Sequence, residues 1–572
     1  MRIKEKRWTL KPELSLQELQ LKEQLNIHPV LCKLLSQRGI TNYDEAKSYF
    51  RPDLSTMHSP WLLKGMELAV NRILEAINKN EKIIVYGDYD VDGTTSVAIV
   101  YDFLVQIYKA ENLEYYIPDR YKEGYGLSKA GIDYAIEHGF TLLITLDCGI
   151  KSTELIDEAL KRGTETIVCD HHLPDSIIPP AVAILNAKQS DCSYPYTDLC
   201  ACGVGFKLIH ALALKLELSE EQYLKYLEFV AIAIAADIVP ITGENRLLAY
   251  HGLKQLNSNP CVGIKSLIDV SGLKGAVNIT NLGFLIGPRI NAAGRMDDAK
   301  KAVSLFLEKD IEKAKHFASL LQEDNRSRKE TDIHITDDAI HQIENNILQE
   351  KKKSIVVYSP EWHKGVIGIV ASRLIERFFK PTIVLTKSGD LISGSARSIP
   401  GFNIHDGLTK CKDLLIGFGG HYFAAGMTLL PENIDLFKAR FEEVVASSLR
   451  DEDYVPSIEI DAEVKLSDLT ASFHNILLQM EPFGPENQRP IFCVRNLKDR
   501  GSKIVKDVHV RFQVEQDGIV FSGICFNQSE KYNRLDLTQP IDIVFSLEEN
   551  VFNGNVSLQL KVIDFAQSSE KK

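Results

Sequence analysis

Five short apolar runs alternate with helical patterns in the first half of the chain. The runs span residues 83–86, 113–117, 142–146, 166–169 and 181–185, and amphipathic helical patterns connect the earlier ones. Runs of this length that are rich in Ile, Val and Leu are typical of strands buried on both faces. Strand, helix and strand in this order predict right-handed βαβ units and a parallel sheet. We therefore expect an α/β fold that binds its ligands at the carboxyl ends of the strands.

Three carboxylates follow the first of these runs at every second position: Asp88, Asp90 and Asp92. In an extended chain, alternate side chains point to the same side. Like charges ~4 Å apart repel by about 4 kcal/mol per pair at an effective dielectric constant near 20, and a divalent cation would offset this repulsion. An EF-hand calcium loop is the alternative for such a motif. It requires a Glu at its twelfth position, where this chain has Ile99, and it lies between helices rather than after a strand.

Further candidate ligands stand at the ends of other apolar segments. Asp147 follows residues 142–146, the triplet Asp170-His171-His172 follows residues 166–169, and Asp237 ends the apolar run 230–236. Taken singly, each has an ordinary explanation, such as a surface or core histidine pair or an Asp at a helix end. Together they supply enough carboxylate and imidazole groups for two hard divalent ions, and the imidazole favours Mn²⁺ over Mg²⁺. Two such ions about 3.5–4 Å apart are suited to phosphoryl transfer.

The pattern of apolar and charged residues divides the remainder of the chain into three further segments. Residues 301–348 have the pattern of long charged helices, and a second α/β segment follows with strands at 355–358, 382–385 and 391–395. Many short alternating runs after residue 455 predict a small β-barrel. The expected domains are an N-terminal cap at 1–65, a parallel-sheet domain at 66–300, connecting helices at 301–350, a second α/β domain at 351–450 and a barrel at 455–568.

Composition limits the class of protein. The chain has 572 residues and a net charge of −12, which excludes a simple basic nucleic-acid coat protein but not a local basic groove. No stretch approaches the ~20 apolar residues that cross a bilayer. The 10 cysteines are few and irregularly spaced, without the paired spacing of a zinc site. We expect a cytoplasmic protein with reduced thiols and no membrane partner.

The predicted barrel carries a local positive charge. Residues 489–511 contain seven Lys or Arg residues and two Asp residues. Phe492 and Phe512 lie in or beside this segment, and two interpretations stay open for them. They could stack on nucleobases, as aromatic residues of OB folds do, or they could belong to the core of the barrel.

The ordered motifs resemble those of the DHH phosphoesterase superfamily. The resemblance rests on residues 86–96, Asp147, Asp170-His171-His172 and Asp237, while Gly419-Gly420-His421 and the Ala-Ala-Gly that follows are similar to the DHHA1 domain. Residues 118–126, 287–296 and 362–372 are similar to the RecJ family of single-strand-specific 5′→3′ DNA exonucleases. The similarity covers nearly the whole chain. It implies a DHH domain, a long helix, a DHHA1 domain and a C-terminal OB-like barrel.

The resemblance also implies a role for each matching residue in a site with two divalent ions, Mn²⁺ or Mg²⁺. Asp90, with Asp88, would hold one ion, and Asp92 would hold the other. Asp147 would bridge both ions. His171 and Asp237 would complete the second site, and His172 would contact the scissile phosphate or assist the attacking water. Asp92, Asp147 and His172 are thus the expected catalytic residues. Substrate phosphates would contact Arg120, Arg289, Ser395, Arg397, Gly419, Gly420 and His421.

The function implied is degradation of single-stranded DNA from its 5′ end to 5′-mononucleotides in DNA repair and recombination. Single-strand-binding protein and a RecQ-type helicase would be its protein partners, and the enzyme would be a monomer. Two alternatives are a DHH phosphodiesterase that acts on oligoribonucleotides or cyclic dinucleotides and a non-catalytic replication scaffold of the same fold. One departure from the family pattern is Glu486, where relatives usually have glycine.

Overall fold

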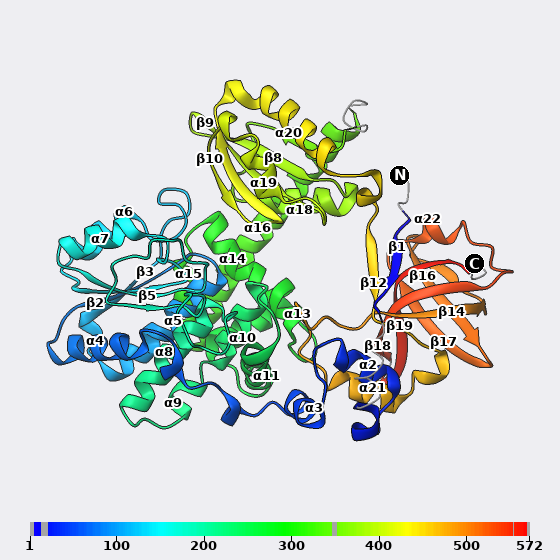
Figure 1. Cartoon of the computed structure of the whole chain (residues 1–572), viewed down its shortest axis with the longest axis horizontal. Coiled ribbons are helices and arrows are strands. Elements are labelled where there is room, and N and C mark those ends of the chain that lie inside the picture. The colour runs from blue at the N-terminus through cyan, green and yellow to red at the C-terminus, as the bar shows by residue number, and fades with distance from the viewer. Residues whose placement is uncertain (1–4, 13–20, 346–351, 553, 569–572) are drawn as a thin grey trace. The chain divides into compact units, whose positions relative to one another are not determined.

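The computed structural model describes residues 5–12, 21–345, 352–552 and 554–568 (Figure 1). The chain divides into two compact units. Unit 1 comprises Met1–Lys47, Lys329–Met480 and Arg489–Lys572, and unit 2 comprises Ser48–Arg328 and Glu481–Gln488. Helix α16, Ile311–Glu344, begins in unit 2 and ends in unit 1, which agrees with the expected connecting helix. In the described part of the chain, no helix is long and apolar enough to cross a membrane.

Unit 2 contains the predicted parallel sheet. Its strand order is β3-β2-β4-β5-β6, and every neighbouring pair is parallel. The strands are β2 Ile83–Gly87, β3 Leu113–Tyr116, β4 Leu142–Leu146, β5 Glu165–Cys169 and β6 Ala183–Leu185.

Helices cover both faces of this sheet. Ile84, Leu143 and Val168 pack against helices α6, Lys129–Glu137, and α7, Thr153–Lys161. The alternate strand residues face a larger core built with α4, Met66–Asn78, α5, Val91–Ile107, and α8, Ala201–Lys215 (Figure 1). Burial on both faces explains why the strands are continuous apolar runs.

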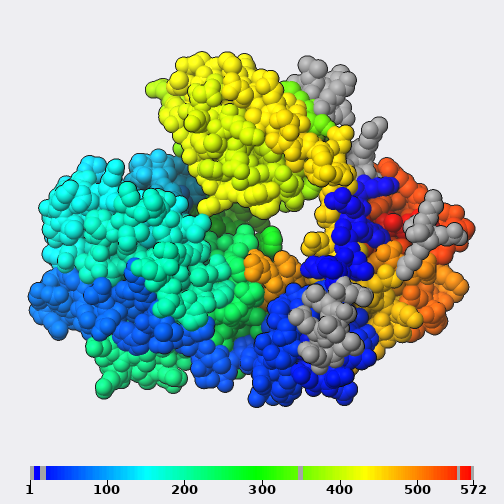
Figure 2. All heavy atoms as spheres, viewed as in Figure 1, coloured from blue at the N-terminus to red at the C-terminus, as the bar shows by residue number. Residues whose placement is uncertain are grey.

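A group of helices completes unit 2. Helix α10, Leu227–Ala236, is apolar on nearly all sides and is a core helix. The other elements are α9 Glu221–Leu224, α11 Gly243–Ser258, α12 Val262–Ser271, α13 Ile279–Asn281, the π-helical turn η4 Leu282–Ile286, α14 Gly287–Met296 and α15 Lys300–Leu307. Figure 2 shows the residues from blue to green in this unit closely packed as one mass.

Unit 1 contains a second, mixed sheet with the order β10-β11-β9-β8-β7. Only β7 and β8 are parallel. Three of the strands match the predicted runs: β7 Ile355–Tyr358, β8 Thr382–Ser388 and β9 Leu391–Arg397. Two further strands are not predicted by the sequence pattern: β10, Leu415–Gly420, and β11, Ala424–Leu429. Their glycines give them a low strand propensity. The helices of this part are α18 Ile367–Phe378, α19 Ile404–Thr409 and α20 Ile434–Ser448.

The predicted β-barrel is also present in unit 1. Its strands are β13 Ala462–Glu463, β14 Phe492–Asp499, β15 Lys503–Val505, β16 His509–Gln516, β17 Ile519–Cys525, β18 Ile541–Phe552 and β19 Asn555–Gln567. Pairing of β14 with both β18 and β16 closes the sheet. Phe492 and Phe512 are fully buried. The core interpretation is therefore confirmed, and base stacking on these two rings is excluded.

One expectation for the barrel was wrong, because the short runs after residue 455 do not all belong to it. The run at 458–460 is not a barrel strand. As β12, Ser457–Ile460, it pairs in parallel with β1, Arg7–Leu10, in a separate two-stranded sheet. The rest of the N-terminal region contains the helices α2, Pro29–Ser36, and α3, Tyr43–Phe50. A pairing between segments about 450 residues apart leaves no local pattern in the sequence.

Candidate metal centre

The turn from β2 to α5 places the three motif carboxylates, and two helix N-termini hold two of them. Asp90 caps α5, since its Oδ1 accepts a hydrogen bond of 3.1 Å from Gly93 N. Asp92 is buried, and its two oxygens accept hydrogen bonds of 2.7 Å each from the backbone N–H groups of Ala201 and Cys202. Because these N–H groups begin α8, the positive end of that helix faces the Asp92 carboxylate.

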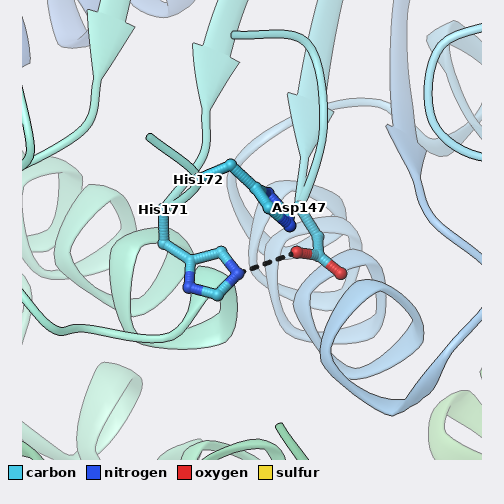
Figure 3. A group of neighbouring side chains, drawn as sticks. All are labelled: Asp147, His171 and His172. Carbon is cyan, nitrogen blue, oxygen red and sulfur yellow. Dashed lines mark ion pairs between the residues drawn. The ribbon is translucent and has the colours of Figure 1, made fainter. Parts of the chain in front are cut away.

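The remaining candidate ligands converge on the same edge of the sheet. Asp147 follows β4 and has a left-handed backbone with φ 62°. Asp237 caps the end of α10. His171 Nε2 lies 3.3 Å from Asp147 Oδ1, 3.7 Å from Asp237 Oδ2 and 3.9 Å from Asp92 Oδ2. Figure 3 shows the His171 ring directed at the Asp147 carboxylate, with His172 beside it.

Three groups of these side chains have ligand atoms within 4.8 Å of one another: Asp88, Asp90 and Asp147; Asp92, His171 and Asp237; and Asp147, His171 and His172. The first two groups coincide with the division into two ion sites that the family resemblance implies, with Asp147 between them. The third group brings His172 to the same place. Which residue holds which ion stays a prediction.

The electrostatics of this cluster favour bound cations. Burial and the charge of Asp90 raise the pKa of Asp88 and of Asp147 well above the usual range of a carboxyl group. The same causes raise the pKa of Asp92 to about 7, and burial and Asp92 raise that of Asp237 to about 9. Burial and His172 lower the pKa of His171 to about 3. A nearby cation would lower the pKa of these carboxyl groups and favour their ionised form. Carboxylate oxygens and the neutral imidazole of His171 are suitable ligands for hard divalent ions.

His172 is held on both sides by hydrogen bonds. Its Nδ1 lies 2.7 Å from Asp170 Oδ1, and its Nε2 lies 3.0 Å from the Tyr125 hydroxyl. Although burial acts in the opposite direction, the hydrogen bond with Asp170 raises the pKa of His172. Burial acts to raise the pKa of Asp170, but the hydrogen bond and charge of His172, together with backbone hydrogen bonds from Ile150 and His172, lower it to about 2. An anionic Asp170 requires a proton on His172 Nδ1, which fixes the orientation of the ring.

The two candidate phosphate-binding arginines of unit 2 have different surroundings. Arg120 is half-buried, and its guanidinium lies 4.8 Å from the centre of the Tyr89 ring. Arg289 is buried, and its donors reach Gln322 Oε1 at 2.7 Å and two backbone carbonyls of unit 2. These contacts favour a structural role for Arg289, while Arg120 is better placed to meet a ligand.

In unit 1, β11 brings together candidate residues that are distant in sequence. Ser395 on β9 pairs with Gly426 on β11, which in turn pairs with Gly419 on β10. Gly420 and His421 continue β10, and Arg397 Nη1 lies 3.1 Å from Ser395 Oγ. A Cβ atom added to Gly368, at the start of α18, would lie 3.0 Å from both the Arg397 guanidinium and Ser395 Oγ. The predicted residues therefore lie close together, and a side chain at Gly368 would crowd Ser395 and Arg397.

Comparison with known proteins places the chain in a family. Family models match for the DHH family N-terminal domain at residues 82–234, the DHHA1 domain at 351–447 and the RecJ OB domain at 460–564. The single-stranded-DNA-specific exonuclease RecJ of Bacillus subtilis is 36% identical over 553 residues, which cover 96% of this chain and 69% of the relative. RecJ of Escherichia coli is 33% identical over 563 residues, or 94% of this chain and 95% of the relative. The chain belongs to the RecJ family.

Solved RecJ structures contain the metals that were expected. A crystal structure of RecJ from Thermus thermophilus in complex with Mn²⁺ matches with a TM-score of 0.84 and 27% identity, covering 99% of this chain and 80% of that one. The Mg²⁺ complex matches with a TM-score of 0.78 and 26% identity, covering 99% and 79% of the two chains. The fold class and the divalent metal cofactor are therefore confirmed.

Several parts of the RecJ-type site were not found by sequence reasoning. The amide groups of Ala201 and Cys202 hold Asp92 although they are about 110 residues away in sequence, so no local motif indicates them. Tyr125 lies in the recognised segment 118–126, but nothing in its spacing indicates a contact with His172. Glu486 has a left-handed backbone with φ 58°, a conformation that glycine adopts more readily than other residues.

Proposed function

We propose that this chain is a metal-dependent 5′→3′ exonuclease that degrades single-stranded DNA to 5′-mononucleotides in DNA repair and recombination. The observation that carries the proposal is the pair of ligand groups, Asp88, Asp90 and Asp147 beside Asp92, His171 and Asp237, at the carboxyl edge of one parallel sheet. Bound divalent ions supply hydroxide near neutral pH and stabilise the charge on the phosphodiester.

The residues around the ions would position the reacting groups. The α8 amides hold Asp92 in one orientation, so the ion that it binds has a fixed place. Asp170 keeps a proton on His172 Nδ1 and leaves Nε2 directed toward Tyr125. In its protonated form, His172 would donate from Nε2 to an oxygen of the scissile phosphate. Other phosphate groups of the strand would be bound by Arg120, Ser395, Arg397, Gly419, Gly420 and His421. Arg289 would have a structural role beside these residues.

Membership of the RecJ family also suggests the location, the oligomeric state and the protein partners. We propose a cytoplasmic monomer that receives single strands opened by a RecQ-type helicase and coated by single-strand-binding protein. Relatives named for single-stranded DNA support the substrate class, and the RecJ OB model supports a module that grips the strand.

The test uses purified protein with 5′-labelled and 3′-labelled single strands, duplex DNA and RNA, each with Mn²⁺, Mg²⁺ or EDTA. We expect mononucleotide release from the 5′ label of single-stranded DNA with either metal, and no reaction in EDTA. Degradation that starts at the 3′ end or that proceeds without metal would contradict the proposal. Preferred cleavage of short RNA would instead favour an oligoribonucleotide phosphodiesterase.

A further inference from the structure

Glu123 accepts three hydrogen bonds within the loop 117–128, which connects β3 to α6. Its Oε1 accepts a bond of 2.8 Å from Asp119 N, and its Oε2 accepts bonds of 3.0 Å from the Tyr116 hydroxyl and 2.6 Å from Ser128 Oγ. Tyr116 ends β3, and Ser128 caps the start of α6. One carboxylate therefore joins the two ends of the loop, and bonds to such an acceptor are stronger than those between neutral groups.

The same loop contacts the candidate metal centre at two points. The Tyr125 hydroxyl lies 3.0 Å from His172 Nε2 and 3.3 Å from the Asp147 carbonyl oxygen. The next backbone amide, Gly126 N, donates a hydrogen bond of 3.2 Å to Asp88 Oδ1. The conformation of the loop therefore decides which groups stand beside the carboxylate cluster.

The position of the Tyr125 hydroxyl depends on the backbone that carries it. The side chain is 55% exposed, and its ring meets the rings of Tyr89 and His172 edge-on. A side chain with so much solvent around it is not fixed by close packing on all sides. The hydroxyl keeps its place beside His172 only while the loop backbone is held.

Glycines on both sides of Tyr125 would leave an unsupported loop flexible. Gly124 has φ 91° and Gly126 has φ 78°, and glycine loses more conformational freedom on ordering than any other residue. After Tyr125, the buried Tyr86 hydroxyl donates a hydrogen bond of 2.9 Å to Gly126 O. Before Tyr125, the corresponding anchor is the Glu123 carboxylate.

We propose that Glu123 is a positioning residue for strand cleavage, because its carboxylate holds the loop 117–128 with the Tyr125 hydroxyl against His172. The inference rests on the proposed function and adds a residue that acts through another. Glu123 is absent from the three ligand groups found among the described residues. Its effect would reach the scissile phosphate through Tyr125 and His172.

The experiment is a double-mutant cycle with Glu123→Gln, Tyr125→Phe and the double variant. We measure kcat at saturating Mn²⁺ and single strand, urea unfolding, and hydrogen exchange of the loop amides. Gln is close to Glu in size but replaces one acceptor oxygen with a donor group. Glu442→Gln is the matched control. In unit 1, Glu442 also accepts three hydrogen bonds, from Lys353 N, Ser354 N and Ser354 Oγ.

We expect Glu123→Gln to lower kcat by about 10-fold, as much as Tyr125→Phe does. The double variant should be no slower than Tyr125→Phe, because both changes remove the same contact with His172. The amides of the loop 117–128 should exchange faster in Glu123→Gln than in the wild type. Glu442→Gln should shift the urea midpoint to a similar extent and keep the wild-type kcat.

Three results would overturn the role of Glu123. The first is a wild-type kcat in Glu123→Gln. The second is a double variant in which the two losses multiply, since independent effects add in free energy. The third is an equal fall of kcat in Glu442→Gln, which would assign the loss to stability alone.

Failure of the proposed function would look different. In that case, wild-type protein would cleave no strand, and hydrogen exchange would still test the anchor. Unchanged exchange of the loop amides in Glu123→Gln would refute it.

Discussion

Tyr125 is the residue whose contacts most directly extend the predicted site. Its hydroxyl lies 3.0 Å from His172 Nε2 and 3.3 Å from the Asp147 carbonyl oxygen. The Tyr125→Phe variant removes the hydroxyl and keeps the ring, so we expect kcat to fall about 10-fold, equivalent to roughly 1.4 kcal/mol. Tyr134→Phe is the control, since the Tyr134 hydroxyl donates a hydrogen bond to Glu114 of β3 rather than to His172. If the Tyr125→Phe enzyme kept the wild-type kcat, the Tyr125 hydroxyl would have no role in catalysis.

Ile238 provides a test of stored strain. Glycine adopts the left-handed conformation freely, whereas an L-residue pays roughly 1–2 kcal/mol. After allowance for the flexibility of glycine in the unfolded chain, Ile238→Gly should raise the free energy of unfolding by about 0.5–1 kcal/mol in urea titrations. Ile333→Gly, at an exposed position within α16, should lose about 1 kcal/mol. Destabilisation by Ile238→Gly would mean that the left-handed backbone carries no strain.

At the scale of elements, α10 carries a buried acid that makes stability depend on pH. Glu228 is 2% exposed and accepts hydrogen bonds from Cys261 N. Burial raises its pKa from 4.5 to about 7. The folded protein thus holds this proton more tightly than the unfolded chain, so the associated stability is complete below pH 4.5 and is lost as the pH rises through 7.

Glu228→Gln should remove this dependence. Between pH 4.5 and 8, wild-type protein should lose on the order of 3 kcal/mol relative to the variant, measured by urea unfolding at each pH. Because Gln keeps an oxygen for Cys261 N, the two proteins should be similarly stable at low pH. Parallel pH profiles for the two proteins would show that Glu228 ionises normally in the folded state.

The elements also show how far the sequence determines the fold. The strands of the parallel sheet could be predicted because burial on both faces leaves continuous apolar runs, and the polar residues at their ends then indicated the metal cluster. The strands β10 and β11 escaped because their glycines lower the local strand propensity. Among these glycines, only Gly420 lies close against other backbone. The pair of β1 and β12, and the α8 amides that hold Asp92, depend on contacts between distant segments that no local pattern records.

In the whole molecule, the net charge of −12 includes two regions with opposite local charge. Buried carboxylates gather at the candidate metal centre, where cations would compensate them. In the barrel segment 489–511, Arg495 pairs with Glu463 and Asp542, and Arg500 pairs with Glu515. The exposed cations that are left for a strand are Lys498, Lys503, Lys506 and Arg511. The overall charge thus carries little information about DNA binding.

We propose that the cluster around Asp147 is the metal centre that cleaves single-stranded DNA. Its most direct test is single-turnover degradation of a 5′-labelled strand in Mn²⁺ by wild-type enzyme and Asp147→Asn, with binding of the same strand measured by fluorescence anisotropy. Asn tolerates the left-handed backbone at this position, so the substitution changes charge and little else. We predict a loss of cleavage of about a thousandfold, or roughly 4 kcal/mol, with strand affinity nearly unchanged. Cleavage by Asp147→Asn at close to the wild-type rate would contradict the account.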